Sequence, residues 1–121
     1  TQSRSSAASD VYKRQEQTRD FVYIDDLINA LSIVLNTTLT DGFIYNVGTG
    51  IQTNLKAVFQ SFEHGFDYHI PYQFEAPRLG DIKHSCADIT PLKALGYNPK
   101  YSIEEGITAY LTYNKHNNIT I

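Results

Sequence analysis

Residues 16–115 show two patterns of apolar and polar positions. Short runs of β-branched and aromatic residues predict strands, because such side chains suit a pleated, partly buried surface. These runs are residues 19–24, 43–47 and 69–74. Elsewhere apolar residues return every three or four positions, which predicts amphipathic helices after residues 25, 53, 88 and 102. Strands that alternate with helices in this way are typical of the α/β fold class.

Residues able to cap a helix stand at the expected helix starts. Asp25 or Asp26 can accept the unpaired N–H groups of a helix through residue 35, and Thr53 can do so for a helix through residue 62. A shorter helix is expected after Asp88. It should stop at Gly96, since glycine readily adopts the left-handed conformation that closes a helix.

The last predicted helix has a two-residue start signal. Ser102 and Glu105 form a Ser-x-x-Glu capping box, in which each side chain accepts a hydrogen bond from the backbone of the other. The apolar residues that follow at helical spacing should form the buried side of this helix. They are Ile103, Ile107, Tyr110 and Leu111.

Residues 1–15 show neither the strand pattern nor the helix pattern. The run TQSRSSAASDVYKRQ has few apolar side chains and cannot bury a face. Its segment 5–15 resembles the translation of a sequencing-library adapter, so we expect residues 1–15 to be a non-native or disordered tail. A genuine flexible terminus is the alternative. Residues 16–121 are then the folded region.

Composition and charge exclude several partners. The chain is 41% hydrophobic and 19% charged, as folded domains are. Ten basic against 13 acidic residues give a net charge of -3, which disfavours a nucleic-acid partner. No apolar run is long enough to cross a bilayer, so no membrane partner is expected. The single cysteine, Cys86, fits a reducing compartment, and we expect a cytoplasmic location.

A glycine turn raises the question of a phosphate site. Gly48 and Gly50 lie between a predicted strand and a predicted helix, but Thr53 stands where the fingerprint G-x-G-x-x-G needs its third glycine. We interpret this segment as a structural turn that needs a positive φ or a close approach of the backbone. The four histidines lack the spacing of metal ligands, and no metal site is expected.

Only two arginines follow residue 15, and each lies at the end of an element. Arg19 opens a predicted strand, and Arg78 lies in a loop. The planar guanidinium group is suited to paired phosphate oxygens. Structural ion pairs, of Arg19 with Asp20 or Asp26 and of Arg78 with Asp81, are the alternative, and spacing leaves both open.

Four motifs occur in a characteristic order. They are TRDFVYIDDL (18–27), FIYNVGTG (43–50), RLGDIKHSCAD (78–88) and LGYNPKYSIEEGI (95–107). Together they resemble the C-terminal part of the NAD-dependent epimerase/dehydratase family, the extended short-chain dehydrogenases that act on nucleotide sugars. The resemblance implies an incomplete α/β fold of the extended Rossmann type. Its N-terminal, NAD-binding half would be missing, and residues 43–47 would be the last strand of its sheet.

The resemblance also implies roles for four residues. Arg19 and Arg78 would bind the diphosphate of a UDP-sugar, and Asp81 would accept a hydrogen bond from a ribose hydroxyl. Ser85 would lie beside the C2 substituent of the sugar, where a small side chain leaves room for an N-acetyl group. The alternative for Ser85 is that it merely faces a neighbouring strand. No catalytic and no NAD-binding residue is expected, since both sets lie upstream in the family.

The implied function is that of a UDP-N-acetylglucosamine or UDP-glucose 4-epimerase, in which bound NAD oxidises the sugar at C4 and returns the hydride to the opposite face. The full-length protein would be a homodimer, and this chain alone is expected to be inactive. Two alternatives remain: a nucleotide-sugar 4,6-dehydratase or decarboxylase, and a noncatalytic nucleotide-binding module. Without its neighbours, the apolar run 43–47 should also leave the isolated chain marginally stable.

Overall fold

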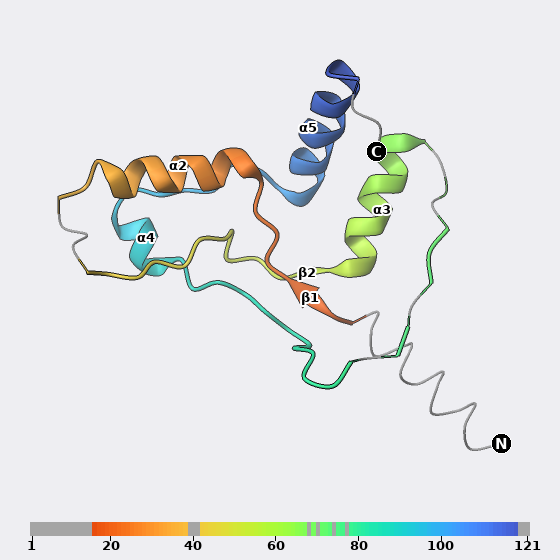
Figure 1. Cartoon of the computed structure of the whole chain (residues 1–121), viewed down its shortest axis with the longest axis horizontal. Coiled ribbons are helices and arrows are strands. Elements are labelled where there is room, and N and C mark those ends of the chain that lie inside the picture. Colours follow the sequence, from red (N-terminus) through yellow and green to blue (C-terminus); the bar gives the residue numbers. More distant parts are fainter. Residues whose placement is uncertain are drawn as a thin grey trace.

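The computed structural model describes residues 16–38, 42–67, 69, 71–73, 75, 76 and 78–118 (Figure 1). The elements in chain order are β1 (Thr18–Arg19), α2 (Ile24–Leu35), β2 (Thr53–Asn54), α3 (Leu55–Phe66), α4 (Thr90–Ala94) and α5 (Ile103–His116). β1 and β2 pair antiparallel, with Thr18 opposite Asn54 and Arg19 opposite Thr53. In Figure 1 this strand pair lies between α2 with α4 on one side and α3 with α5 on the other.

The hydrophobic core lies where α4 and the residues after it pack on α2. Ala30 of α2 and Leu92 of α4 are almost fully buried, and Ile89 and Tyr97 complete the cluster. Six apolar residues pack against this cluster and are partly buried. They are Ile33, Val34, Tyr45, Val47, Ala87 and Leu95. Segments distant in the sequence therefore share one core.

Helices α3 and α5 pack on each other at the other side of the strand pair (Figure 1). The rings of Phe62 and Tyr110 meet edge to face with their centroids 6.3 Å apart. A side chain at Gly65 would begin only 2.5 Å from Leu111 Cδ1, so the end of the Leu111 side chain would have to move to admit it. On α5, Ile107 is buried as predicted, whereas Tyr110 remains 44% exposed.

The predicted strands are wrong in extent. The run 19–24 contributes only Arg19 to β1, and α2 already begins at Ile24. Residues 43–47 belong to no strand, and Phe43 and Ile44 are 70% and 93% exposed. Within 69–74, the described residues form no strand either, and residues 70 and 74 lie outside the described part of the chain. Strand propensity reports a side chain's fit to a sheet surface, whereas a strand also needs a backbone neighbour to hydrogen-bond.

The capping box of α5 and the glycine that ends α4 are confirmed, whereas the N-cap of α4 is Ile89 and not the predicted Asp88. Ser102 Oγ accepts from Glu105 N–H at 3.2 Å, and Glu105 Oε2 accepts from Ser102 N–H at 2.9 Å, which completes the capping box of α5. Gly96 has φ +102° just after α4. Asp88 lies one residue before the N-cap of α4 and accepts from Thr90 N–H at 3.0 Å.

The capping predictions for α2 and α3 are wrong. Helix α2 begins at Ile24, so Asp25 and Asp26 lie inside its first turn rather than before it. For α3 the cap is displaced by one residue: Asn54 Oδ1 accepts from Lys56 N–H at 2.7 Å, while Thr53 lies in β2. Several polar residues in a row leave the helix start ambiguous, and tertiary contacts decide among them.

The assignment of residues 1–15 as a tail falls outside the described residues and stays a prediction. Among the helices that the structure describes, none is long and apolar enough to cross a membrane.

Candidate functional site

Arg19 lies in a strand that is paired on both edges. Besides β2 on one edge, residues 83–85 run parallel to β1 on the other. Thr18 N–H donates to Lys83 O at 2.9 Å, and Ser85 N–H donates to Thr18 O at 3.3 Å, so Thr18 and His84 form a parallel bridge. The segment that follows Arg78 in the sequence is thereby brought alongside Arg19.

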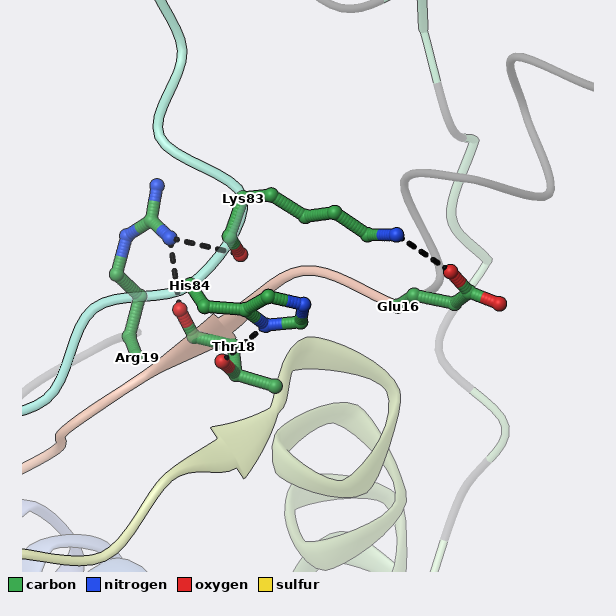
Figure 2. Close-up of polar contacts among 5 residues, drawn as sticks. All are labelled: Glu16, Thr18, Arg19, Lys83 and His84. Atoms are coloured by element: carbon green, nitrogen blue, oxygen red, sulfur yellow. Dashed lines mark hydrogen bonds and ion pairs between the residues drawn. The ribbon is translucent and has the colours of Figure 1, made fainter.

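The guanidinium group of Arg19 is held by backbone carbonyls (Figure 2). Its Nη1 donates to Thr18 O at 2.7 Å and to Lys83 O at 3.4 Å. In the part of the chain that the structure describes, Arg19 forms no ion pair with Asp20 or Asp26, so that alternative is wrong. Arginine carries five N–H donors, and within the described part of the chain the remaining donors of Arg19 and its charge are available to an anion.

Arg78 and Asp81 are brought together by a tight turn. Arg78 N–H donates to Asp81 Oδ2 at 3.1 Å, and Asp81 N–H donates to Arg78 O at 3.1 Å. Gly80 between them has φ +88°, as the third residue of a type II turn requires. Both residues are exposed. The next residue, Ile82, is fixed beside the start of β1, because its carbonyl accepts from Gln17 Nε2 at 3.0 Å.

The backbone of Ser85 pairs with β1, as the neighbouring-strand alternative expected, but its side chain is exposed. The residues on either side of it contact β1 through their side chains: His84 Nδ1 lies 2.8 Å from Thr18 Oγ1, and Cys86 Sγ lies 3.9 Å from Asp20 Oδ2. Successive side chains of extended segments point to opposite faces. Arg19 and Ser85 therefore share the face opposite to these two contacts.

Two polar contacts surround the bridge (Figure 2). Thr18 Oγ1 lies 2.8 Å from His84 Nδ1, as Figure 2 shows. The same hydroxyl donates to Gln52 Oε1 at 3.3 Å. Lys83 Nζ lies 2.8 Å from Glu16 Oε2, and this hydrogen bond and charge lower the pKa of Glu16. The pair is about half exposed and contributes little to stability.

Asp20 holds three segments together through one carboxylate. Its Oδ1 accepts from Thr49 N–H at 2.8 Å and from Thr49 Oγ1 at 2.6 Å. Its Oδ2 accepts from Gly50 N–H at 2.9 Å and from Ala87 N–H at 3.2 Å. Burial raises the pKa of Asp20, but the hydrogen bonds from Thr49, Gly50 and Ala87 outweigh it and lower the pKa overall. We call these contacts the Asp20 clamp.

The glycine turn is shaped by the Asp20 clamp, which confirms its interpretation as a structural turn. A Cβ at Gly48 would lie 2.5 Å from Asp20 Oδ2 and 2.8 Å from Ala87 Cβ, so any side chain there would collide. Gly50 has φ +75°. The buried Tyr97 donates its hydroxyl to Gly48 O at 2.7 Å and links the turn to the core.

The same contacts test whether this turn fits the diphosphate of NAD. In a dinucleotide site the amides of the turn point at phosphate oxygens. Here the amides of Thr49 and Gly50 already bind the carboxylate of Asp20, whose negative charge would repel a phosphate. The turn at residues 48–50 therefore does not fit the diphosphate of NAD.

A polar cavity of about 320 Å³ opens beside the clamp. The cavity is lined by residues 46–47, by residues 85–87 and by Asp20. Since side chains of consecutive residues alternate, the main chain forms part of this wall. Within the described residues, no group of three or more metal-ligating side chains occurs.

The role of Asp20 was not predicted from the sequence, where this residue was considered only as an ion-pair partner of Arg19. A signal was present, because two glycines in a turn indicate that another group approaches the backbone closely. Which group approaches could not be told from spacing.

Several solved structures and curated proteins are similar to this chain. UDP-glucose 4-epimerase from Thermotoga maritima with UDP-glucose superimposes with a TM-score of 0.75 and 32% identity over 85% of this chain and 33% of that one. The Bifidobacterium longum enzyme in complex with NAD+ and UDP gives a TM-score of 0.76 and 27% identity over 87% and 32%. UDP-glucose 4-epimerase of Bacillus subtilis is 37% identical over 94 residues, 72% of this chain and 26% of that protein. No family model matches the chain.

The chain spans about one third of the length of the curated relatives it matches. These matches confirm the family resemblance indicated by the four motifs, and they confirm the fold as a partial match to extended short-chain dehydrogenase structures.

Proposed function

We propose that this chain is the C-terminal, nucleotide-sugar-binding part of a UDP-sugar 4-epimerase. It matches about one third of the length of NAD-dependent UDP-sugar epimerases, chiefly UDP-glucose 4-epimerases. Its ligand is a UDP-sugar, with UDP-N-acetylglucosamine and UDP-glucose as substrates of the whole protein. NAD, which supplies the hydride chemistry, and the residues that act on the sugar belong to parts of the whole protein outside this chain.

The observation that carries the proposal is the register of residues 83–85 on β1. It places Arg19 and Ser85 on one face of two paired segments. A cationic donor next to a small hydroxyl side chain suits the junction between a diphosphate and a sugar. The exposed Arg78–Asp81 turn precedes the same segment and offers a second guanidinium for the diphosphate and an acceptor for a ribose hydroxyl.

Calorimetric titration with UDP tests the nucleotide site. We expect Arg78→Ala to weaken UDP binding by about 2–3 kcal/mol, the scale of losing charge-assisted hydrogen bonds. Lys93→Ala is the matched control, because Lys93 is an exposed cation in the last turn of α4 and no role in ligand binding is proposed for it. An unchanged UDP affinity in Arg78→Ala, or an equal loss in Lys93→Ala, would contradict the assignment.

Sugar choice tests Ser85 in the whole protein. Tyrosine at this position would fill the space for an N-acetyl group with a rigid ring, which a packed pocket cannot absorb cheaply. Ser85→Tyr should therefore abolish kcat/KM for UDP-N-acetylglucosamine while sparing UDP-glucose, and Ser85→Ala should keep both substrates. Equal losses on both sugars in Ser85→Tyr would refute the role of Ser85.

A further inference from the structure

We propose that Asp20 is a positioning residue for the nucleotide-sugar site: its carboxylate fixes residues 85–87 against β1, so that Arg19 and Ser85 face one ligand. The proposal rests on the proposed function of these two residues. It adds a residue whose carboxylate is already engaged by the backbone N–H groups of Thr49, Gly50 and Ala87.

The first step is the connection between the segments. Asp20 follows Arg19 directly, and its Oδ2 binds the N–H of Ala87, two residues after Ser85. The parallel bridge between Thr18 and His84 attaches the segment before the Arg19–Ser85 pair, and the hydrogen bond between Asp20 and Ala87 attaches it after the pair. A segment attached before and after a residue cannot rotate that residue away.

The second step is the rigidity of the clamp itself. The same carboxylate is held by Thr49 and by Gly50 N–H, in a turn that is tied to the buried Tyr97 through Gly48 O. Asp20 thus connects an exposed pair of segments to the hydrophobic core. Groups that must hold a ligand need support of this kind from residues behind them.

The third step concerns charge. A carboxylate next to an arginine in the sequence would ordinarily be a candidate to neutralise it. Here both oxygens of Asp20 accept hydrogen bonds from Thr49, Gly50 and Ala87, and among the described residues Arg19 is bound only to the carbonyls of Thr18 and Lys83. The clamp therefore leaves the charge of Arg19 available for an anion.

The chain offers a matched control for a test of this role. Asp26 also accepts two backbone N–H groups, from Lys100 at 2.9 Å and Tyr101 at 3.1 Å, and also joins distant segments. It does so in the first turn of α2, away from residues 83–87. Asp26→Asn thus weakens a similar contact without changing the segment that carries Ser85.

The first measurement is UDP affinity by calorimetry on the intact chain and on both variants. We expect Asp20→Asn to weaken UDP binding about tenfold and Asp26→Asn to change it less than about twofold. Thr49→Val, which removes one donor and keeps the charge of Asp20, should give an intermediate loss even if Asp20→Asn does not fold. Affinity that stays within about twofold in Asp20→Asn and Thr49→Val, or equal losses with Asp26→Asn, would overturn the role of Asp20.

The second measurement reports the clamp without any nucleotide. Cys86 is exposed, and its thiol pKa is raised by burial and by the nearby charge of Asp20. Asp20→Asn should therefore speed the reaction of Cys86 with a maleimide, because more thiolate forms, whereas Asp26→Asn should not. An unchanged rate in Asp20→Asn would contradict the placement of the Asp20 carboxylate beside Cys86, on which its positioning role depends.

The two measurements separate the two proposals. Absence of UDP binding by the unsubstituted chain, together with the expected thiol rates, would contradict the proposed function while the clamp stands. UDP binding that Asp20→Asn leaves intact would contradict the positioning role alone.

Discussion

Two aspartates hold this chain together with the same chemistry in different surroundings. Asp26 is 2% exposed and accepts the N–H groups of Lys100 and Tyr101, just before the capping box of α5. Asp20 is partly accessible and accepts from Thr49, Gly50 and Ala87, next to the proposed ligand face. In both places the carboxylate accepts hydrogen bonds from backbone N–H groups of irregular segments, as a backbone carbonyl does in a helix or sheet.

The difference in surroundings separates stability from position. A buried acceptor that is removed leaves its donors without water, so the whole desolvation cost falls on the folded state. N–H donors near the surface can bind water once their acceptor is removed. The substitution then changes mainly the position of the segment that carries them. We therefore expect Asp26 to contribute more to stability and Asp20 more to the placement of its neighbours.

The largest effect is expected on unfolding. Asp26→Ala should lower the free energy of unfolding by about 3 kcal/mol, because the N–H groups of Lys100 and Tyr101 lose an acceptor whose side chain is buried. Asp20→Ala should cost less. Urea unfolding of dilute protein in the cold, followed by circular dichroism, measures both. A larger loss in Asp20→Ala than in Asp26→Ala would reverse the comparison.

A smaller effect should follow from the segment that Asp26 fixes. Ser102→Ala removes the side-chain half of the capping box and should cost about 1 kcal/mol in the same urea experiment. Thr108→Ala, on the exposed side of α5, is the control and should cost less. If the double variant Asp26→Ala/Ser102→Ala loses the sum of the two single effects in free energy of unfolding, the contacts of Asp26 and the capping box act independently.

The smallest effect is the acid response of the Asp20 clamp. Hydrogen bonds hold the pKa of Asp20 below its ordinary value of 3.8, so its contribution to stability is complete above that pH and is lost as the pH falls through the folded-state pKa. The difference in thermal midpoint between the unsubstituted chain and Asp20→Asn should stay constant from neutral pH down to about pH 4 and shrink below it. A difference that grows on acidification would contradict the lowered pKa.

Local signals in the sequence placed the helices well and the strands poorly. The capping box, the glycine after α4 and the helical spacing of apolar residues depend on contacts a few residues apart, which the sequence displays directly. The apolar run 43–47 has strand-like side chains but no described backbone partner, and Ile44 is left 93% exposed. Pairing depends on a second segment, and no local pattern reports its presence.

The amino-acid sequence by itself determined the helices, the structural role of the glycine turn and the family resemblance, because each rests on residue types at fixed short spacing. It also named Arg19, Arg78, Asp81 and Ser85 through that resemblance. Only the tertiary structure decided that residues 83–85 pair with β1 and that Asp20 serves the turn and Ala87 rather than Arg19. These contacts join residues far apart in the sequence, and their partners are chosen by which backbone donors folding brings within reach of an acceptor.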